Sequence, residues 1–149
     1  MQKLKNYIKK FFLIDDTPHK IAAGFALGIF WGIMPGEGVA TTLITAALLR
    51  FNRLSATAGV LASNMWATFI VLPLAATVGG FFFNVSPKLL IQDFNETYRL
   101  GLKYFFAETI IIEILTPFFI GFLTVSVSIS LFFYFALYFL LKYGKLRFK

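Results

Sequence analysis

The architecture of this chain depends most on residues 19–53, HKIAAGFALGIFWGIMPGEGVATTLITAALLRFNR. Its first apolar run, Ile21 to Pro35, would reach only about 22 Å as an α-helix, whereas the hydrocarbon core of a membrane is about 30 Å thick. A second apolar run, Val39 to Leu49, is shorter still and ends before Arg50 and Arg53. Two half-length helices joined by a tight turn predict a re-entrant hairpin, which enters the bilayer and returns without crossing it.

The composition of the whole chain favours lipid as its solvent. Of the 149 residues, 58% are hydrophobic and only 14% are charged, which lies outside the usual balance of a soluble domain. The 20 phenylalanines are spread along the whole sequence, so no soluble half is left to form a separate domain. We therefore expect one all-α integral membrane domain over residues 1–149.

The remaining segments complete this architecture. Residues 1–16 combine lysines with apolar residues at near-helical spacing, which is typical of a helix at the membrane interface. A second interfacial helix is predicted where Leu90, Phe94 and Tyr98 recur every four residues among polar neighbours. The predicted order is an interfacial helix (1–16), the re-entrant hairpin (21–49), a spanning helix (54–83), an outer interfacial helix (86–106), a spanning helix (109–141) and a basic tail (142–149).

The basic residues test this topology, because lysine and arginine near short loops prefer the cytoplasmic side. With a re-entrant hairpin, eleven of the 14 basic residues lie inside, and only Lys88, Arg99 and Lys103 lie outside. If residues 21–49 crossed once instead, the split would be eight to six. The charges therefore favour the hairpin, with both termini cytoplasmic.

Small residues indicate close helix packing around the hairpin. Glycine recurs every fourth residue along its first arm, at Gly24, Gly28, Gly32 and Gly36, and such a stripe lets helix backbones approach closely in a membrane. Gly59 and Ser63 repeat the spacing in the first spanning helix. We predict that the hairpin lies flat against a neighbour; direct contact between the glycines and a ligand is the alternative. The turn itself contains Pro35, Gly36 and Gly38.

Polar residues at the tip and base of the hairpin are the candidate substrate-binding or proton-switch residues. Glu37 stands at the tip, where a carboxylate is costly in lipid unless it is neutralised, paired or hydrated. Arg50 and Arg53 stand at the base as partners for Glu37 or as anchors for phosphates. Asn64 lies mid-span, where an amide can form hydrogen bonds between helices. The alternative is a turn in the head-group layer, with Glu37 solvated.

Several classes of function are excluded or disfavoured. Because the chain has no cysteine, it can have no disulfide, no thiol nucleophile and no metal site with cysteine ligands. It has a single histidine, which makes a histidine-based metal site improbable. The net charge is +7, and the basic residues that produce it lie at the edges of apolar segments. In that position they suit binding to anionic lipid head groups rather than to nucleic acid. We predict no metal, no cofactor and no enzymatic activity, because nucleophile, base and orienting residue do not occur at informative spacing.

A family resemblance is carried by an ordered set of motifs: Asp16 to Ala22, Gly24 to Gly28, Pro35, Gly38, Thr41, Leu49 to Asn52, Asn64, Pro117 and Gly121. Together they resemble the bacterial family called domain of unknown function 2062, over most of the chain, although Met65 stands where that family usually has proline. The resemblance implies the bacterial inner membrane. It also implies a link to envelope glycosyltransferases, near which similar proteins are found. The turn from Met34 to Glu37 is in addition similar to the re-entrant tips of DedA-type lipid-carrier transporters, by analogy alone.

Two functional hypotheses follow. The first is a transporter or scramblase-like protein for an anionic lipid carrier or small solute. Glu37 would be its switch, Arg50 and Arg53 would receive a phosphate-bearing head group, and the glycine-lined arm would leave a groove for an acyl or prenyl chain. The second is a non-catalytic membrane adaptor that packs against a glycosyltransferase through the glycine stripe. Anionic membrane lipids are the expected partners in both, and a homo-oligomer is compatible with either.

Overall fold

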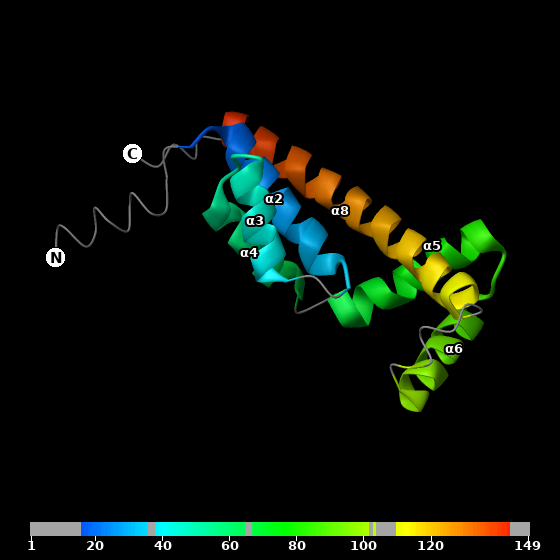
Figure 1. The fold of residues 1–149 in the computed structure, drawn as a ribbon. Helices are drawn as coiled ribbons and strands as arrows, with labels where there is room; N and C mark the ends of the chain where they lie inside the picture. The colour runs from blue at the N-terminus through cyan, green and yellow to red at the C-terminus, as the bar shows by residue number, and fades with distance from the viewer. Residues whose placement is uncertain (1–15, 36–37, 65–66, 102, 104–109, 144–149) are drawn as a thin grey trace. The chain divides into compact units, whose positions relative to one another are not determined.

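The computed structural model describes residues 16–35, 38–64, 67–101, 103 and 110–143, and within these ranges the chain is helical and contains no strand (Figure 1). The all-α fold class is therefore confirmed. The predicted interfacial helix 1–16 and basic tail 142–149 lie almost entirely outside the described residues. The elements are α2 (Pro18–Ile33), α3 (Val39–Leu48), α4 (Arg53–Asn64), the π-helix η1 (Ala67–Val71), α5 (Leu72–Phe83), α6 (Pro87–Leu100), the π-helix η3 (Ile111–Leu115) and α8 (Thr116–Tyr143).

The chain divides into two compact units. Unit 1 consists of Met1–Asn64 and Ile129–Lys149, and unit 2 consists of Met65–Ser128. Helix α8 therefore supplies its first part to unit 2 and its last part to unit 1. The composition predicts a single domain and marks no boundary here, because apolar residues run through both units.

The two hairpin arms are short helices with clear local causes. Thr17 caps α2 by accepting a hydrogen bond at Oγ1 from the N–H of Lys20, at 3.3 Å, and Pro18 suits the first turn. Helix α2 has 16 residues and α3 has 10, which gives them lengths of about 24 Å and 15 Å. Both are shorter than a bilayer core, as the sequence pattern predicts.

The glycine stripe of α2 faces α4. A Cβ atom added to Gly24 would meet the carbonyl of Asn52, and one added to Gly28 would meet the carbonyl of Ala56. A Cβ atom on Gly32 would come within 3.0 Å of the carbonyl oxygen of Val60. Each step of four residues along α2 is matched by a step of four residues in the same direction along its partner, so α2 and α4 run parallel. The reversal needed for this arrangement is made by α3.

The segment predicted as one spanning helix, 54–83, is described in separate pieces. Helix α4 ends at Asn64, and η1 and α5 follow after residues 65–66, which lie outside the described part. The π-helix η1 precedes Pro73, and η3 similarly precedes Pro117. Proline has no N–H and its ring clashes with the carbonyl four residues earlier, so a widened turn just before it relieves both problems.

Unit 2 is built around a crossing of α5 and the first part of α8. A Cβ atom on Gly79 would meet the backbone of Pro117, and one on Gly121 would meet the backbone of Ala75. Here the contact positions move in opposite directions along the two helices, so the crossing is antiparallel.

The amphipathic helix α6 also belongs to unit 2. Leu90 is 1% exposed, and the ring of Phe94 lies 5.2 Å from that of Phe118 on α8. Tyr98, the third residue of the predicted apolar side, is 68% exposed. Leu90 is thus buried within the unit and Phe94 contacts α8, and the interfacial position of α6 stays a prediction. The helix itself is shorter than the predicted 86–106.

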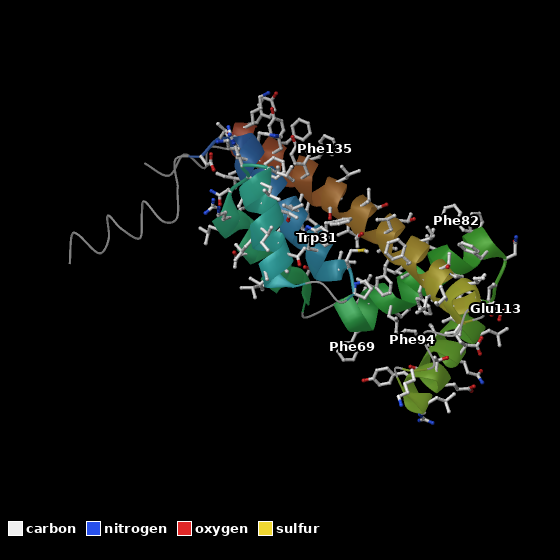
Figure 2. The ribbon with its side chains drawn as sticks, viewed as in Figure 1. Trp31, Phe69, Phe82, Phe94, Glu113 and Phe135 are labelled. Atoms are coloured by element: carbon white, nitrogen blue, oxygen red, sulfur yellow. The ribbon has the colours of Figure 1, made fainter. Side chains whose placement is uncertain are left out.

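One helix of the described residues, Ile111–Tyr143, is long and apolar enough to cross a membrane. It overlaps the predicted span 109–141 from Ile111 onward, and only 22% of its most apolar window is buried inside the protein, whereas the core helix of a soluble protein is mostly buried. The segments Phe69–Phe83 and Pro87–Leu100 are long enough to cross a membrane only when they are taken together, and they are bent by 115° relative to each other. Figure 2 shows Phe69 and Phe82 pointing away from the ribbon of unit 2, and both are largely exposed.

Candidate functional site

The most elaborate set of polar contacts lies at one end of unit 1, which we call the basic end. It is formed by the first turn of α2, the connection between α3 and α4, and the last turns of α8. The parallel packing of α2 and α4 explains why it exists, because it brings the starts of both helices to the same place. Its described polar and aromatic residues are Asp16, Thr17, His19, Lys20, Arg50, Phe51, Asn52, Arg53, Ser55, Tyr134, Tyr138 and Lys142.

Asn52 ties α4 to α2. Its backbone N–H donates to the carbonyl of Lys20 at 3.1 Å, and its Nδ2 donates to Oδ2 of Asp16 at 3.3 Å. Its Oδ1 accepts the N–H of Ser55 at 2.8 Å and so caps α4. The Ser55 hydroxyl in turn donates to the carbonyl of Ile21 at 2.6 Å. Since Asn52 is only 6% exposed, these hydrogen bonds hold the connection in a fixed position.

Arg50 occupies an unusual backbone position at the end of α3. Its φ is 56°, in the left-handed region. Its N–H donates to the carbonyl of Ala47 at 3.2 Å, and the N–H of Phe51 donates to the carbonyl of Ala46 at 2.9 Å. This pair of bonds is a Schellman motif, in which the left-handed residue is usually glycine.

The cationic side chains of this end are open to solvent. Arg50, Arg53 and Lys20 are all exposed, and Lys20 forms an ion pair of 3.4 Å with Asp16. Asp16 also accepts the N–H of Thr17 at Oδ1, at 3.2 Å. One carboxylate is thereby used to fix the start of α2.

Aromatic residues of α8 complete the basic end. Nδ1 of His19 lies 2.9 Å from the hydroxyl of Tyr134, and the His19 ring also meets Phe51 edge-on at 5.9 Å. Tyr134 stacks on Tyr138, whose hydroxyl accepts a hydrogen bond from Nζ of Lys142 at 3.2 Å. Tyrosine and lysine at the end of an apolar helix are typical of a membrane interface, where rings and ammonium groups reach the head groups.

The net charge is concentrated in the same unit. Unit 1 contains eleven lysines and arginines against three acidic residues, whereas unit 2 contains three against four. Almost the whole positive charge thus belongs to the unit that has the basic end. Among the described residues, no three acidic or histidine side chains converge as a metal ion would require.

Of the predicted substrate-binding or proton-switch residues, the structure describes the side chains of Arg50 and Arg53. Arg50 and Arg53 come together at the basic end. Glu37 and Gly36 lie outside the described residues, as does the side chain of Asn64, so their roles stay predictions. Pro35 and Gly38 are exposed on either side of residues 36–37.

The predicted glycine-lined groove is wrong. Gly24, Gly28 and Gly32 are buried, and the space beside them is filled by the connection and α4, with the hydroxyl of Ser63 lying against Gly32. The stripe therefore packs within unit 1. It offers no space for an acyl chain and no free face for a partner.

Sequence reasoning missed several residues of the basic end. The sequence patterns mark Asp16 and Asn52 only as parts of family motifs. Asn52 is of a residue type that favours the N-cap position, and this signal could have located the start of α4. No local pattern could have revealed the pairing of His19 with Tyr134, which are 115 residues apart.

The motifs from Asp16 to Ala22 and from Leu49 to Asn52 are joined by the hydrogen bonds of Asn52, and the family described as "Uncharacterized protein conserved in bacteria (DUF2062)" matches residues 1–148. The chain belongs to the DUF2062 family. No curated protein and no solved structure matches it. Membership in DUF2062 therefore assigns the chain to a bacterial family and leaves its function to be argued from the site.

Proposed function

We propose that this DUF2062 protein is a multi-pass protein of the bacterial inner membrane that moves an anionic lipid carrier or a small anionic solute. The observation that carries the proposal is the basic end, where Arg50 and Arg53 are exposed on a connection fixed by Asn52. Guanidinium groups form strong, paired hydrogen bonds with phosphate oxygens. The basic end is thus suited to receive a phosphate-bearing head group.

The apolar surface of unit 1 supports a membrane setting. Ile44 and Leu48 of α3 are exposed, as are Phe132 and Phe135 of α8, and Figure 2 shows Phe135 on the outside of its helix. Hydrocarbon beside these faces would accommodate a lipid chain while its head group reaches the arginines. This arrangement replaces the groove that the glycines were expected to leave.

The topology belongs to the same proposal. Helices α2 and α3 would form the re-entrant hairpin, and the basic end and both termini would face the cytoplasm, as the distribution of lysine and arginine favours. Glu37, at the predicted hairpin tip, would be the residue that takes up and releases a proton.

The experiment is movement of a fluorescent phosphatidic acid across vesicles that contain only the purified protein. The unmodified chain should move the lipid with a rate that depends on pH. Glu37→Gln keeps the shape of the side chain but cannot ionise, so its rate should be low and independent of pH. Glu96→Gln, on the exposed side of α6, removes a carboxylate from unit 2 and should behave as the unmodified chain.

The outcomes separate transport from the adaptor hypothesis. Normal pH-dependent movement in Glu37→Gln would remove the proton switch. If the unmodified chain moves no lipid but binds an envelope glycosyltransferase, the adaptor hypothesis replaces transport. Its docking face would then have to be a surface other than the buried glycine stripe.

A further inference from the structure

Helices α3 and α5 are each followed by a residue in the left-handed backbone conformation, and the residue type differs between the two. Of the described residues other than glycine, Arg50 after α3 and Asn84 after α5 have a positive φ, of 56° and 54°. Asparagine is an ordinary residue at such a position, because its short side chain tolerates the left-handed region. Arginine has no such compensation, so glycine would fit the end of α3 better.

Among the described residues, none forms a hydrogen bond or ion pair with the guanidinium of Arg50. The Schellman hydrogen bonds are formed by the backbone N–H groups of Arg50 and Phe51, and these bonds would persist with glycine. The side chain is exposed. The described part of the fold therefore gives a reason for the left-handed turn but none for an arginine in it.

The neighbouring residues hold the backbone at Arg50 in a defined place. Asn52 is bonded to α2 through Lys20 and Asp16 and to α4 through Ser55. Arg50 and Arg53 stand two residues before it and one residue after it. Two guanidinium groups carried by one fixed connection suit an anion with several oxygens better than a carboxylate with two.

We infer that Arg50 binds the phosphate group of a lipid head group, at the expense of stability at the end of α3, and that Asn52 and Ser55 are positioning residues for it. The inference rests on one part of the proposed function, the binding of an anion at the basic end, and it narrows that anion to a phosphate-bearing lipid. It does not depend on whether that lipid is moved or only bound.

The test is a trade-off between stability and binding. The full chain in a neutral detergent is titrated with short-chain phosphatidic acid by calorimetry, and its thermal midpoint is measured separately. Arg50→Gly should raise the midpoint and weaken binding by about tenfold, which corresponds to the loss of one charged hydrogen-bonding group. Arg50→Lys keeps the positive charge but loses the planar guanidinium that forms two parallel hydrogen bonds, so it should also bind phosphatidic acid more weakly.

Matched variants separate binding from folding. Asn84→Gly changes the equivalent position of unit 2 and Arg99→Gln removes an exposed arginine from α6, and both should bind as the unmodified chain does. Ser55→Ala should weaken binding, and Ser55→Thr, which keeps the hydroxyl, should restore it. Unchanged binding in Arg50→Gly, or a fall in its midpoint, would overturn the inference for Arg50. Unchanged binding in Ser55→Ala would overturn the positioning role.

Two further titrations define the ligand. A fatty acid of the same chain length should bind more weakly than phosphatidic acid, and equal binding would contradict phosphate selectivity. Inorganic phosphate should compete only weakly, because it lacks the acyl chains; binding as tight as that of phosphatidic acid would assign the site to a free anion. Intact binding without lipid movement in vesicles would refute the proposed transport and leave this inference standing.

Discussion

Both units of this protein pack helices through glycines, but they do so in opposite directions. In unit 1, Gly24 and Gly28 of α2 lie against the connection and α4, and the two helices run parallel. In unit 2, Gly79 and Gly121 form the contacts of an antiparallel crossing between α5 and α8. The same small-residue chemistry therefore produces two different arrangements of helix ends.

The direction of packing decides which helix ends meet. In unit 1 the starts of α2 and α4 lie at the same end as the last turns of α3 and α8, so the partial charges of the helix ends offset one another, and the positive charge there comes from Lys20, Arg50 and Arg53. Antiparallel helices place opposite ends together, and unit 2 has nearly balanced charges. A site for an anion is therefore expected in unit 1 and not in unit 2.

The largest effect is expected where the parallel packing is interrupted. Gly28→Leu would drive a side chain into the backbone of α4 at Ala56 and should destabilise unit 1 by about 3 kcal/mol, the upper part of the range for overpacking. Thermal unfolding of the purified protein in detergent measures it. Gly38→Leu is the matched control, because open space surrounds that glycine. Equal tolerance at both positions would show that close packing of α2 on α4 is not needed.

A smaller effect compares the start of a helix in each unit. Thr17 caps α2 through its side chain, whereas Ser86 precedes α6 without a capping hydrogen bond from its side chain. Thr17→Ala should therefore destabilise the protein by about 1 kcal/mol, and Ser86→Ala should change little. Denaturation of both variants under the same conditions measures the difference. A larger loss of stability in Ser86→Ala than in Thr17→Ala would contradict the conclusion that the start of α2 is fixed more tightly than the start of α6.

The sequence was most informative where local rules act. Helix α2 begins after a capping threonine and ends before Pro35, and both limits follow from capping and proline chemistry. The spacing of Gly24, Gly28 and Gly32 indicated close packing, because a repeat of four residues places them on one side of a helix.

What the sequence could not supply were the partners of these elements. The glycine stripe has no feature that selects α4 over an acyl chain or another protein, so the predicted groove was wrong. Leu90 and Phe94 of α6 have the same pattern whether they meet lipid or the ring of Phe118. Asn52 and Asp16 are 36 residues apart, and only the parallel packing of α2 and α4 brings them together.

The central claim is that the hairpin returns to the side on which it begins, so that Lys20, Leu49 and Lys142 face the cytoplasm together. The chain has no cysteine, so single cysteines introduced at these three exposed positions, and at the exposed Asn95 of α6, can be labelled without background. A membrane-impermeant maleimide should modify Asn95→Cys in intact bacterial cells with an opened outer membrane, and the other three only in inverted vesicles. Labelling of Leu49→Cys from the same side as Asn95→Cys would show that residues 21–49 cross the membrane and would contradict the account.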